Sequence, residues 1–445
     1  MAVFLHGLTN EREISAALRF LSRHDIPYFA QGGAHGYSPT LAVIQHAVMI
    51  KMERFDEIRF NDDNSVTVGG AVLFGDLMSA LYAAGRELTV GSCVCVGSTG
   101  AMLGGGHGRL QGKHGLTSDA LRSVRMVLWN GTVVEASESK NPDLFWGMRG
   151  AGHNFGVVIE STYETFPQEN DGMHYNADMV FTSDSLEGVI NVINSLIPDQ
   201  DPALALDLLF FIDPSTMSPV IFLNLVYAGT QAEGQRYADL FASTNPGNST
   251  TGPRISRLSV DASVATFGDL NNVAAGGAIT AACATGSRQN AYTSTLRTLD
   301  VSTMRQLFAS FATFVQENPL AINSLILFEI FGQEGIDAKP NDYSAYPNRG
   351  FANVLTLLQM TYTNDAVADA ADTWARQWRD TLTLPDVSGY PQQHVYENYA
   401  HGDEPLEAIY GYDEWRRERL TSLKRKFDPK DNFNGYHAIP LDGMW

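Results

Sequence analysis

Residues 91–108 read Gly-Ser-Cys-Val-Cys-Val-Gly-Ser-Thr-Gly-Ala-Met-Leu-Gly-Gly-Gly-His-Gly and hold two of the three cysteines of this chain. Three of the glycines are consecutive. Glycines at this density let the backbone approach a flat or charged group closely, because no Cβ stands in the way. A thiol beside such a loop can bond to whatever the loop holds. The stretch therefore predicts a cradle for a cofactor.

The composition limits the number of domains and the classes of partner that this chain can have. A chain of 445 residues with 44% hydrophobic residues predicts about two or three units with buried cores. The net charge of −20 disfavours nucleic acid and anionic membranes as partners and suits a small neutral or cationic substrate. No run of about twenty apolar residues is present, so no membrane span is predicted. The N-terminus is too quickly polar for a secretory signal, and two Asn-x-Ser/Thr motifs, at Asn130 and Asn248, leave the compartment open.

The patterns along the chain change near residue 170. Before it, strands alternate with helices, which favours an α/β unit. Asn10 followed by Glu13 indicates a helix start, and a charged helix is predicted at 414–426. Beyond residue 170 we expect strands of one broad sheet with helices on one side, from apolar runs at 204–211, 220–227 and 325–331. Surface loops are predicted at 243–253 and 332–350.

A second glycine loop precedes the first one by about sixty residues. It places His35 in a Gly-Gly-Ala-His-Gly turn after a short predicted strand at 28–30. Alone, such a histidine is often a surface residue. Neither loop has the Gly-Lys-Ser/Thr of a nucleotide-hydrolase phosphate loop. A zinc site built from Cys93, Cys95 and His35 or His107 is an alternative, but Cys-x-Cys is not the usual zinc spacing, and we predict no metal.

Together these motifs resemble the flavoproteins of the berberine-bridge-enzyme-like group, in the vanillyl-alcohol-oxidase superfamily. The resemblance is strongest over residues 1–167 and 394–440. The blocks that carry it follow one another in the family's order: Gly-Gly-x-His at 32–35, the loop 91–108, Gly-Leu-Thr-Ser-Asp at 115–119, the hairpin 127–134, 141–150, 154–158, Tyr-Glu-Asn-Tyr at 396–399, Phe-Asp-Pro at 427–429 and Asn-Phe-Asn-Gly-Tyr at 432–436.

The resemblance implies an α+β fold with a bipartite PCMH-type FAD-binding domain and a central substrate domain built on an antiparallel sheet flanked by helices. The boundaries fall at 1–167, 168–393 and 394–445, and the N-terminal part lacks the family's usual first subdomain unit. FAD is implied as the cofactor, bonded through its 8α-methyl to His35 and through C6 to Cys93. Such covalent linkage commonly raises the redox potential of the flavin. Cys95 is interpreted as structural, with the role of tether as the alternative.

The other positions implied to contact FAD lie mostly in the two glycine loops, whose backbone amides suit a pyrophosphate. They are Gly32, Gly33, Ala34, Gly36, Gly97, Ser98, Gly100, Gly104, Gly105, Gly106, Gly156, Val158, Asn398 and Asn434. Ala101 departs from the family pattern, because many members carry a histidine there.

Four positions are implied to carry the chemistry. Val96 leaves room for dioxygen beside the flavin, which favours an oxidase. His107 is a candidate base, or a histidine bonded only to its loop. Tyr396 is a second candidate base, or a packed tyrosine. Gln359 matches a Glu/Gln position of the family and can orient a substrate but cannot take its proton.

A further carboxylate, Glu329, lies in another predicted strand of the same sheet, where we expect it to be solvated.

The function implied is that of an FAD-dependent oxidase of the fungal biosynthetic type. Hydride passes from an alcohol or amine-like carbon of a specialised metabolite to flavin N5, and dioxygen reoxidises the flavin to give hydrogen peroxide. The implied partners are a small-molecule substrate and dioxygen, without nucleic acid or membrane. The alternatives are a carbohydrate or secondary-alcohol oxidase and, from another class, a non-redox binding protein or cyclase on the same fold.

Overall fold

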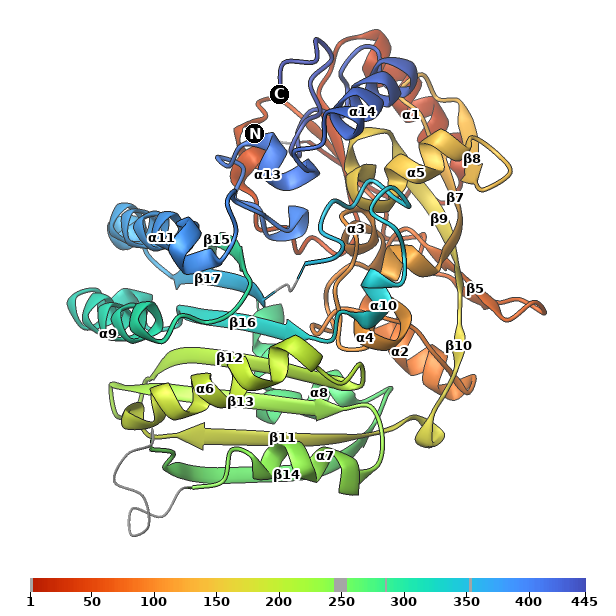
Figure 1. The fold of residues 1–445 in the computed structure, drawn as a ribbon. Coiled ribbons are helices and arrows are strands. Elements are labelled where there is room, and N and C mark those ends of the chain that lie inside the picture. The colour runs from red at the N-terminus through yellow and green to blue at the C-terminus, as the bar shows by residue number, and fades with distance from the viewer. Residues whose placement is uncertain (1–2, 244–253, 285, 352–353) are drawn as a thin grey trace.

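The computed structural model describes residues 3–243, 254–284, 286–351 and 354–445 (Figure 1). The first part of the chain forms two main sheets. A parallel sheet has the order β1-β3-β2 and an antiparallel sheet the order β4-β5-β9-β7-β8. Their strands are β1 (Val3–Leu5), β2 (Tyr28–Gln31), β3 (Val48–Lys51), β4 (Ile58–Phe60), β5 (Ser65–Gly69), β7 (Leu121–Val127), β8 (Val133–Ser137) and β9 (Val157–Glu164), and β6 (Arg86–Glu87) pairs separately with β10 (Phe166–Pro167).

The predicted α/β alternation is correct for the parallel sheet and wrong for the larger, antiparallel one. Short connections cause the difference, since two strands joined by a tight turn must run antiparallel. Asn64, at φ 62°, lies in the turn between β4 and β5, and Gly131, at φ 78°, lies in the turn between β7 and β8. Both residues adopt the left-handed conformation that such turns require.

The central region forms a seven-stranded sheet in which every neighbouring pair is antiparallel, in the order β14-β11-β13-β12-β16-β17-β15. The three predicted strands are confirmed as β12, β13 and β16, and the α+β class is confirmed with them. The strands are β11 (Met173–Phe181), β12 (Leu204–Asp213), β13 (Ser218–Tyr227), β14 (Arg257–Thr266), β15 (Arg288–Leu296), β16 (Leu325–Phe331) and β17 (Val354–Tyr362).

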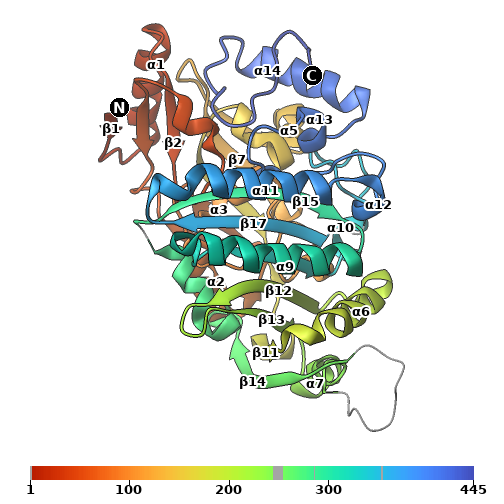
Figure 2. The ribbon, with the colours of Figure 1, turned by 90° about the vertical axis from the view of Figure 1, so that its left-hand side faces the viewer.

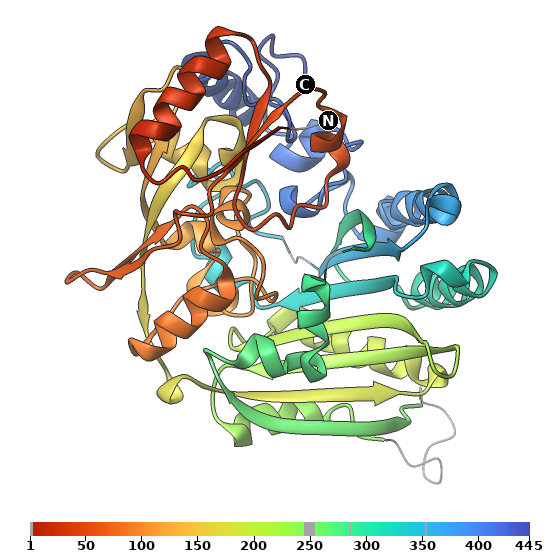
Figure 3. The same cartoon turned by 180° about the vertical axis from the view of Figure 1, so that it is seen from behind.

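One face of this sheet is covered by helices. The Phe210 ring of β12 packs between Phe328 of β16 and Phe308 of α9, so the even-numbered side chains of β16 face the helices. Figure 2 shows α9 and α11 on the viewer's side of the sheet, running along its strands. The odd-numbered side chains, Glu329 among them, therefore face the opposite side. On that side lie the short helix α8 and the segment after it, toward the viewer in Figure 3.

The first helix begins at the N-cap that the sequence indicated. Asn10 accepts hydrogen bonds from the backbone amides of Arg12 and Glu13, as predicted, and α1 buries Ile14 and Leu18. The bounds are α1 (Glu11–Arg23), α2 (Phe74–Ala83), α3 (Ser98–Leu103), α4 (Gln111–His114), α5 (Pro142–Ala151), α6 (Leu186–Leu196), α7 (Gln231–Asp239), α8 (Leu270–Val273), α9 (Val301–Glu317), α10 (Glu334–Asp337), α11 (Ala368–Leu382), α12 (Pro385–Ser388), α13 (Leu406–Tyr410) and α14 (Glu414–Phe427).

The C-terminal segment returns to the N-terminal unit. Its charged helix is confirmed as α14, which packs on α5 (Figure 1). A fully buried ion pair fixes the end of this helix, because Lys424 Nζ lies 2.8 Å from Asp428 Oδ2 and donates to the carbonyl of Phe433 at 2.8 Å. The domain boundaries at 167/168 and 393/394 stay predictions.

The expected surface loop at 332–350 is confirmed only in part, for residues 338–342, which are exposed and lie outside any helix or strand. It contains α10, and residues 344–349 are buried. Polar side chains allow this burial, because Arg349 pairs with Asp119 and the buried Arg416 donates to the carbonyl of Ser344 at 2.8 Å. Most of the other expected loop, 244–253, lies outside the described residues.

Candidate functional site

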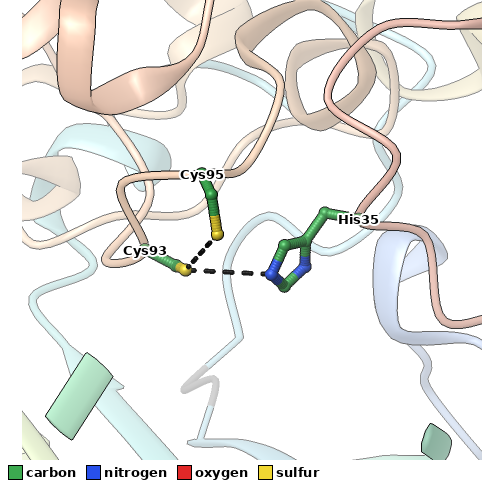
Figure 4. A group of neighbouring side chains, drawn as sticks. All are labelled: His35, Cys93 and Cys95. Atoms are coloured by element: carbon green, nitrogen blue, oxygen red, sulfur yellow. Dashed lines mark hydrogen bonds between the residues drawn. The ribbon is translucent and has the colours of Figure 1, made fainter. Parts of the chain in front are cut away.

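Two loops of the N-terminal unit bring His35 and Cys93 together (Figure 4). His35 follows β2 and Cys93 follows β6, and the Cys93 Sγ atom lies 3.8 Å from His35 Nε2. Both side chains are half-buried. Burial raises the pKa of the Cys93 thiol, while hydrogen bonds from the backbone amides of Cys95 and Val96 lower it. The fold thus brings side chains from two separate loops next to each other.

The two loops contact each other through their backbones. A Cβ built on Gly97 would lie 2.8 Å from Gly33 N, so glycine is needed for this contact. Ala34 has a φ of 57°, a strained conformation that clusters at functional sites. A Cβ built on Gly36 or Gly100 would meet no atom within 4 Å. The loops therefore pack tightly where Gly33 meets Gly97 and leave open space beside Gly36 and Gly100.

Cys95 forms a disulfide with Cys283, 188 residues later in the chain. This bond gives Cys95 the structural role that the sequence indicated, although three cysteines alone predicted no disulfide. The disulfide also affects the zinc site that the sequence offered as an alternative. His35, Cys93 and Cys95 are close enough to hold an ion, but the sulfur of Cys95 is already bonded, which leaves two donors where structural zinc takes four.

His107 lies in the buried turn after the triple glycine, with both ring nitrogens engaged. Nδ1 lies 2.8 Å from Gln111 Oε1, and Nε2 lies 2.9 Å from the hydroxyl of Tyr346. Because the Gln111 oxygen can only accept, Nδ1 carries the proton and Nε2 accepts from Tyr346. Burial, with the positive charge of Arg349, lowers the pKa of His107 to about 4. The imidazole is therefore neutral at pH 7.

Tyr396 lies against His107, and three donors converge on its phenol oxygen. The amides of Gly106 and His107 donate at 3.2 Å and 3.4 Å, and Asn398 Nδ2 donates at 2.6 Å. A neutral phenol oxygen has two lone pairs, so three donors match the phenolate better. Burial raises the pKa of Tyr396 to about 12, and these donors act against that rise.

Two tyrosines connect the loops to the seven-stranded sheet. Tyr37 donates to Gln359 Oε1 at 3.2 Å, and Tyr399 donates to Glu329 Oε2 at 2.9 Å. The Tyr37 and Tyr399 rings are in edge contact with centroids 6.4 Å apart. Glu329 is only 5% exposed, so the expectation of a solvated carboxylate is wrong. Its burial, with the negative charge of Asp207, raises the pKa of Glu329 to about 8.

A row of buried polar residues continues across the sheet from Glu329. Asp207 on β12 lies opposite Glu329, and Asn224 on β13 lies opposite Asp207. Arg109, two residues after His107, reaches this row and donates to Asp207 Oδ2 at 2.8 Å. Its other terminal nitrogen donates to Asn271 Oδ1 at 2.6 Å. Arg109 thereby joins the glycine loop to the opposite sheet.

The triple glycine packs against protein. A Cβ on Gly104 would overlap the side chain of Asn398, which also donates to the carbonyl of Ala101 at 2.8 Å. Gly105 and Gly106 have φ values of 122° and 85°, which side-chain-bearing residues rarely adopt. These contacts and backbone angles explain, from the fold alone, why glycine is needed at the three positions.

The remaining predicted positions differ in their surroundings. Ser98 is buried and donates to the carbonyl of Val72 at 2.9 Å. Val96 is half-buried against the main core. Gly156 and Val158 lie at the start of β9, and Asn434 is exposed, with one hydrogen bond to Asp431 at 3.4 Å.

Five residues of the site were not singled out from the sequence. Tyr37 lies two residues after His35, Tyr399 closes the Tyr-Glu-Asn-Tyr block, and Arg109 follows the triple glycine, so proximity to a motif could have found these three. Tyr346 lies in the expected surface loop, and Cys283 lies in a segment without a motif. Only the folded chain reveals these two.

Comparisons with known proteins identify the family to which the chain belongs. Residues 5–137 match the model of the FAD binding domain family. The chain is 35% identical to the FAD-linked oxidoreductase OXR1 of Pyricularia oryzae, covering 97% of this chain and 83% of that protein. It is 32% identical to the FAD-linked oxidoreductase srdI of Neurospora crassa, with the same coverage of 97% and 83%.

Solved structures share the fold. BBE-like 1 of Physcomitrella patens superposes with a TM-score of 0.79 at 22% identity, covering 99% of this chain and 91% of that one. A chitooligosaccharide oxidase superposes with a TM-score of 0.75 at 21% identity, covering 98% and 91%. Among the described residues, none of the helices combines the length and the apolar character needed to cross a membrane. With relatives of this identity along nearly its whole length, the chain belongs to the FAD-linked oxidoreductases and has the fold of the berberine-bridge-enzyme-like flavoproteins.

Proposed function

We propose that this chain is an oxidase that holds FAD by two covalent bonds, through His35 and Cys93. The observation that carries the proposal is the 3.8 Å distance between Cys93 Sγ and His35 Nε2, on two glycine loops in backbone contact. An imidazole and a thiol this close can reach two positions on the same edge of one ring system, such as the 8α-methyl and C6 of the flavin. The space beside Gly36 and Gly100 is where the rest of the cofactor has room. FAD, when bound, accepts a hydride from the substrate and returns the electrons to dioxygen, which leaves as hydrogen peroxide.

Tyr396 is the residue that takes the substrate proton in this proposal, and it does so as the phenolate, because the neutral phenol that a pKa of about 12 maintains at pH 7 cannot accept a proton. Its oxygen lies where three donors stabilise a negative charge, as an oxyanion site does. His107 has both ring nitrogens occupied, so it serves as a positioning residue that holds Tyr346 and directs its own amide toward Tyr396. The choice between the two candidate bases therefore falls on Tyr396.

The substrate side of the site is formed by the seven-stranded sheet. Gln359 and Glu329 point from it toward Tyr37 and Tyr399, and the raised pKa keeps Glu329 protonated at pH 7. Neutral amide, carboxyl and phenol groups suit the hydroxyl or amine-bearing carbon of a small specialised metabolite. Val96, beside Cys93, is the proposed gate that admits dioxygen.

The test begins with colour. The purified protein should be yellow, and the colour should stay with the polypeptide after acid precipitation. His35→Ala or Cys93→Ala alone should keep the flavin attached, and the double variant should release it into the acid supernatant. A colourless protein that takes up no FAD, or a wild-type protein that releases all its flavin in acid, contradicts the proposal. Peroxide release during turnover tests the oxidase half independently.

A further inference from the structure

The sulfur atoms of all three cysteines of the chain meet beside the proposed flavin attachment point. Cys93 remains a thiol, and its Sγ lies 3.5 Å from Cys95 Sγ and 3.8 Å from Cys283 Sγ. The disulfide joins the latter two. Cys283 ends the segment that follows α8 and belongs to the central region of the chain, whereas the other two cysteines lie in the glycine loop (Figure 4).

Three sulfurs at contact distance permit three disulfide pairings. A Cys93 thiolate that attacks Cys95 Sγ forms a Cys93–Cys95 bond and releases Cys283 as a thiolate. Attack on Cys283 Sγ forms a Cys93–Cys283 bond and releases Cys95. Either exchange conserves one disulfide and one thiolate, so it needs no added oxidant or reductant. Only the observed pairing, Cys95 with Cys283, leaves Cys93 as a thiol.

The segment that leads to Cys283 is held in place by contacts other than the disulfide. Asn271, on α8, donates from Nδ2 to the carbonyl of Gly91 at 2.8 Å, two residues before Cys93. Farther along, the backbone amides of Ala275 and Gly276 donate to the carboxylate of Asp178 at 3.0 Å and 2.7 Å. This segment is therefore held to the glycine loop by Asn271 and to β11 by Asp178, and the disulfide adds a covalent bond to the contact with the loop.

We propose that Cys283 is a positioning residue for flavin attachment: by bonding Cys95 it removes the competing sulfur and keeps Cys93 available beside His35. The inference rests on the proposed sulfur-linked FAD. Without Cys283, Cys93 and Cys95 are two thiols 3.5 Å apart, and an oxidant such as glutathione disulfide converts them into a disulfide with reduction of the oxidant to glutathione. Without Cys95, Cys93 faces Cys283 in the same way. In both cases Cys93 enters a disulfide, so it is no longer the thiol to which the flavin would be bonded.

The test uses the full chain and four proteins: wild type, Cys283→Ser, Cys95→Ser and the double variant Cys95→Ser/Cys283→Ser. Each is produced in an oxidising glutathione buffer, denatured with iodoacetamide and digested without reduction. Mass spectrometry of the peptides then reports whether Cys93 carries flavin, an alkyl group or a disulfide. The double variant is the matched control. It lacks the same disulfide as the single variants, but it contains no other cysteine with which Cys93 could form a disulfide.

In wild type we expect Cys95 bonded to Cys283 and flavin on Cys93. Each single variant should show a disulfide that contains Cys93 and a loss of sulfur-linked flavin of about tenfold, and the double variant should regain it. Full attachment in the single variants, or no recovery in the double variant, overturns the inference. If wild-type Cys93 is alkylated and carries no flavin, the proposed attachment fails. The disulfide state of Cys93 in the variants still tests the protective role in that case, because alkylated Cys93 in the single variants refutes it.

Discussion

Replacing Glu329 by glutamine tests how the seven-stranded sheet holds a proton next to the site. Glu329 is 5% exposed, lies opposite Asp207 in the sheet and accepts a hydrogen bond from Tyr399. The charged groups that face it are Asp207 and, behind Asp207, the guanidinium of Arg109. Burial and the charge of Asp207 together raise the pKa of Glu329 from its ordinary value of 4.5 to about 8. Glutamine keeps the shape and cannot titrate.

The sign of the effect follows from proton binding. Between pH 4.5 and about 8 the folded protein holds a proton on Glu329 that the unfolded chain has released. The stability that this carboxyl contributes is therefore fully present below pH 4.5 and is lost as the pH rises through about 8. The loss amounts to about 1.4 kcal/mol per pH unit, or roughly 4–5 kcal/mol over the whole interval. Glu329→Gln removes this loss.

The assay is urea unfolding of the flavin-loaded protein at pH 5, 7 and 9, followed by tryptophan fluorescence. Glu329→Gln should match wild type near pH 5 and exceed it at pH 9 by up to about 4 kcal/mol in the free energy of unfolding. Glu57→Gln is the matched control, because the Glu57 side chain is 73% exposed and its replacement should leave the pH dependence unchanged. A Glu329→Gln protein that parallels wild type at all three pH values refutes the reasoning.

Three further predictions follow from other contacts. Tyr396→Phe removes the oxygen on which three donors converge and should lower the rate of flavin reduction about 10²–10⁴-fold in stopped-flow absorbance, with flavin content unchanged; a smaller loss than tenfold contradicts the role of base. Val96→Leu should slow the reoxidation of the reduced flavin by dioxygen, measured in the same instrument, and leave the rate of flavin reduction almost unaltered. A variant that is reoxidised as fast as wild type contradicts the role of Val96 as an oxygen gate. Lys424→Met strands the buried carboxylate of Asp428 and should cost about 3–5 kcal/mol in urea unfolding, while the exposed Lys426→Met should cost little.

Continuous apolar runs made three strands of the large sheet predictable, and its polar strands were missed for a physical reason. β15 includes Thr293, Ser294 and Thr295, all buried. A buried hydroxyl is tolerated where it finds an acceptor, and Thr293 Oγ1 donates to the carbonyl of Thr356 on the neighbouring strand. The partner lies 63 residues away. The hydroxyls of Ser294 and Thr295 have no such acceptor among the described residues. Local composition therefore indicates polarity at such a strand without indicating which of its hydroxyls find an acceptor.

The same reasoning explains the buried segment that was expected to be a surface loop. Its polar character is satisfied by Arg416, which is fully buried and donates to the carbonyls of Asn341, Ser344 and Ala345. A second buried arginine, Arg349, pairs with Asp119 in the N-terminal unit. This segment carries Tyr346 to His107. Neither arginine stands in a motif that reveals its partner, so the sequence alone could not place Tyr346 in the site.

The two sides of the site differ in how much sequence signal they leave, and this difference bears on the substrate. The loops around His35 and Cys93 are contiguous stretches in which glycines serve local backbone needs, so they form motifs. The opposite side consists of single side chains, Glu329 and Gln359, on neighbouring strands of one sheet. Each is tied by a tyrosine to another part of the chain, and replacing one of them need not disturb the strand around it. Specificity can therefore change one side chain at a time on the sheet while the loops stay constant, so we expect the Glu329–Tyr399 and Gln359–Tyr37 pairs to distinguish this chain's substrate from those of its relatives.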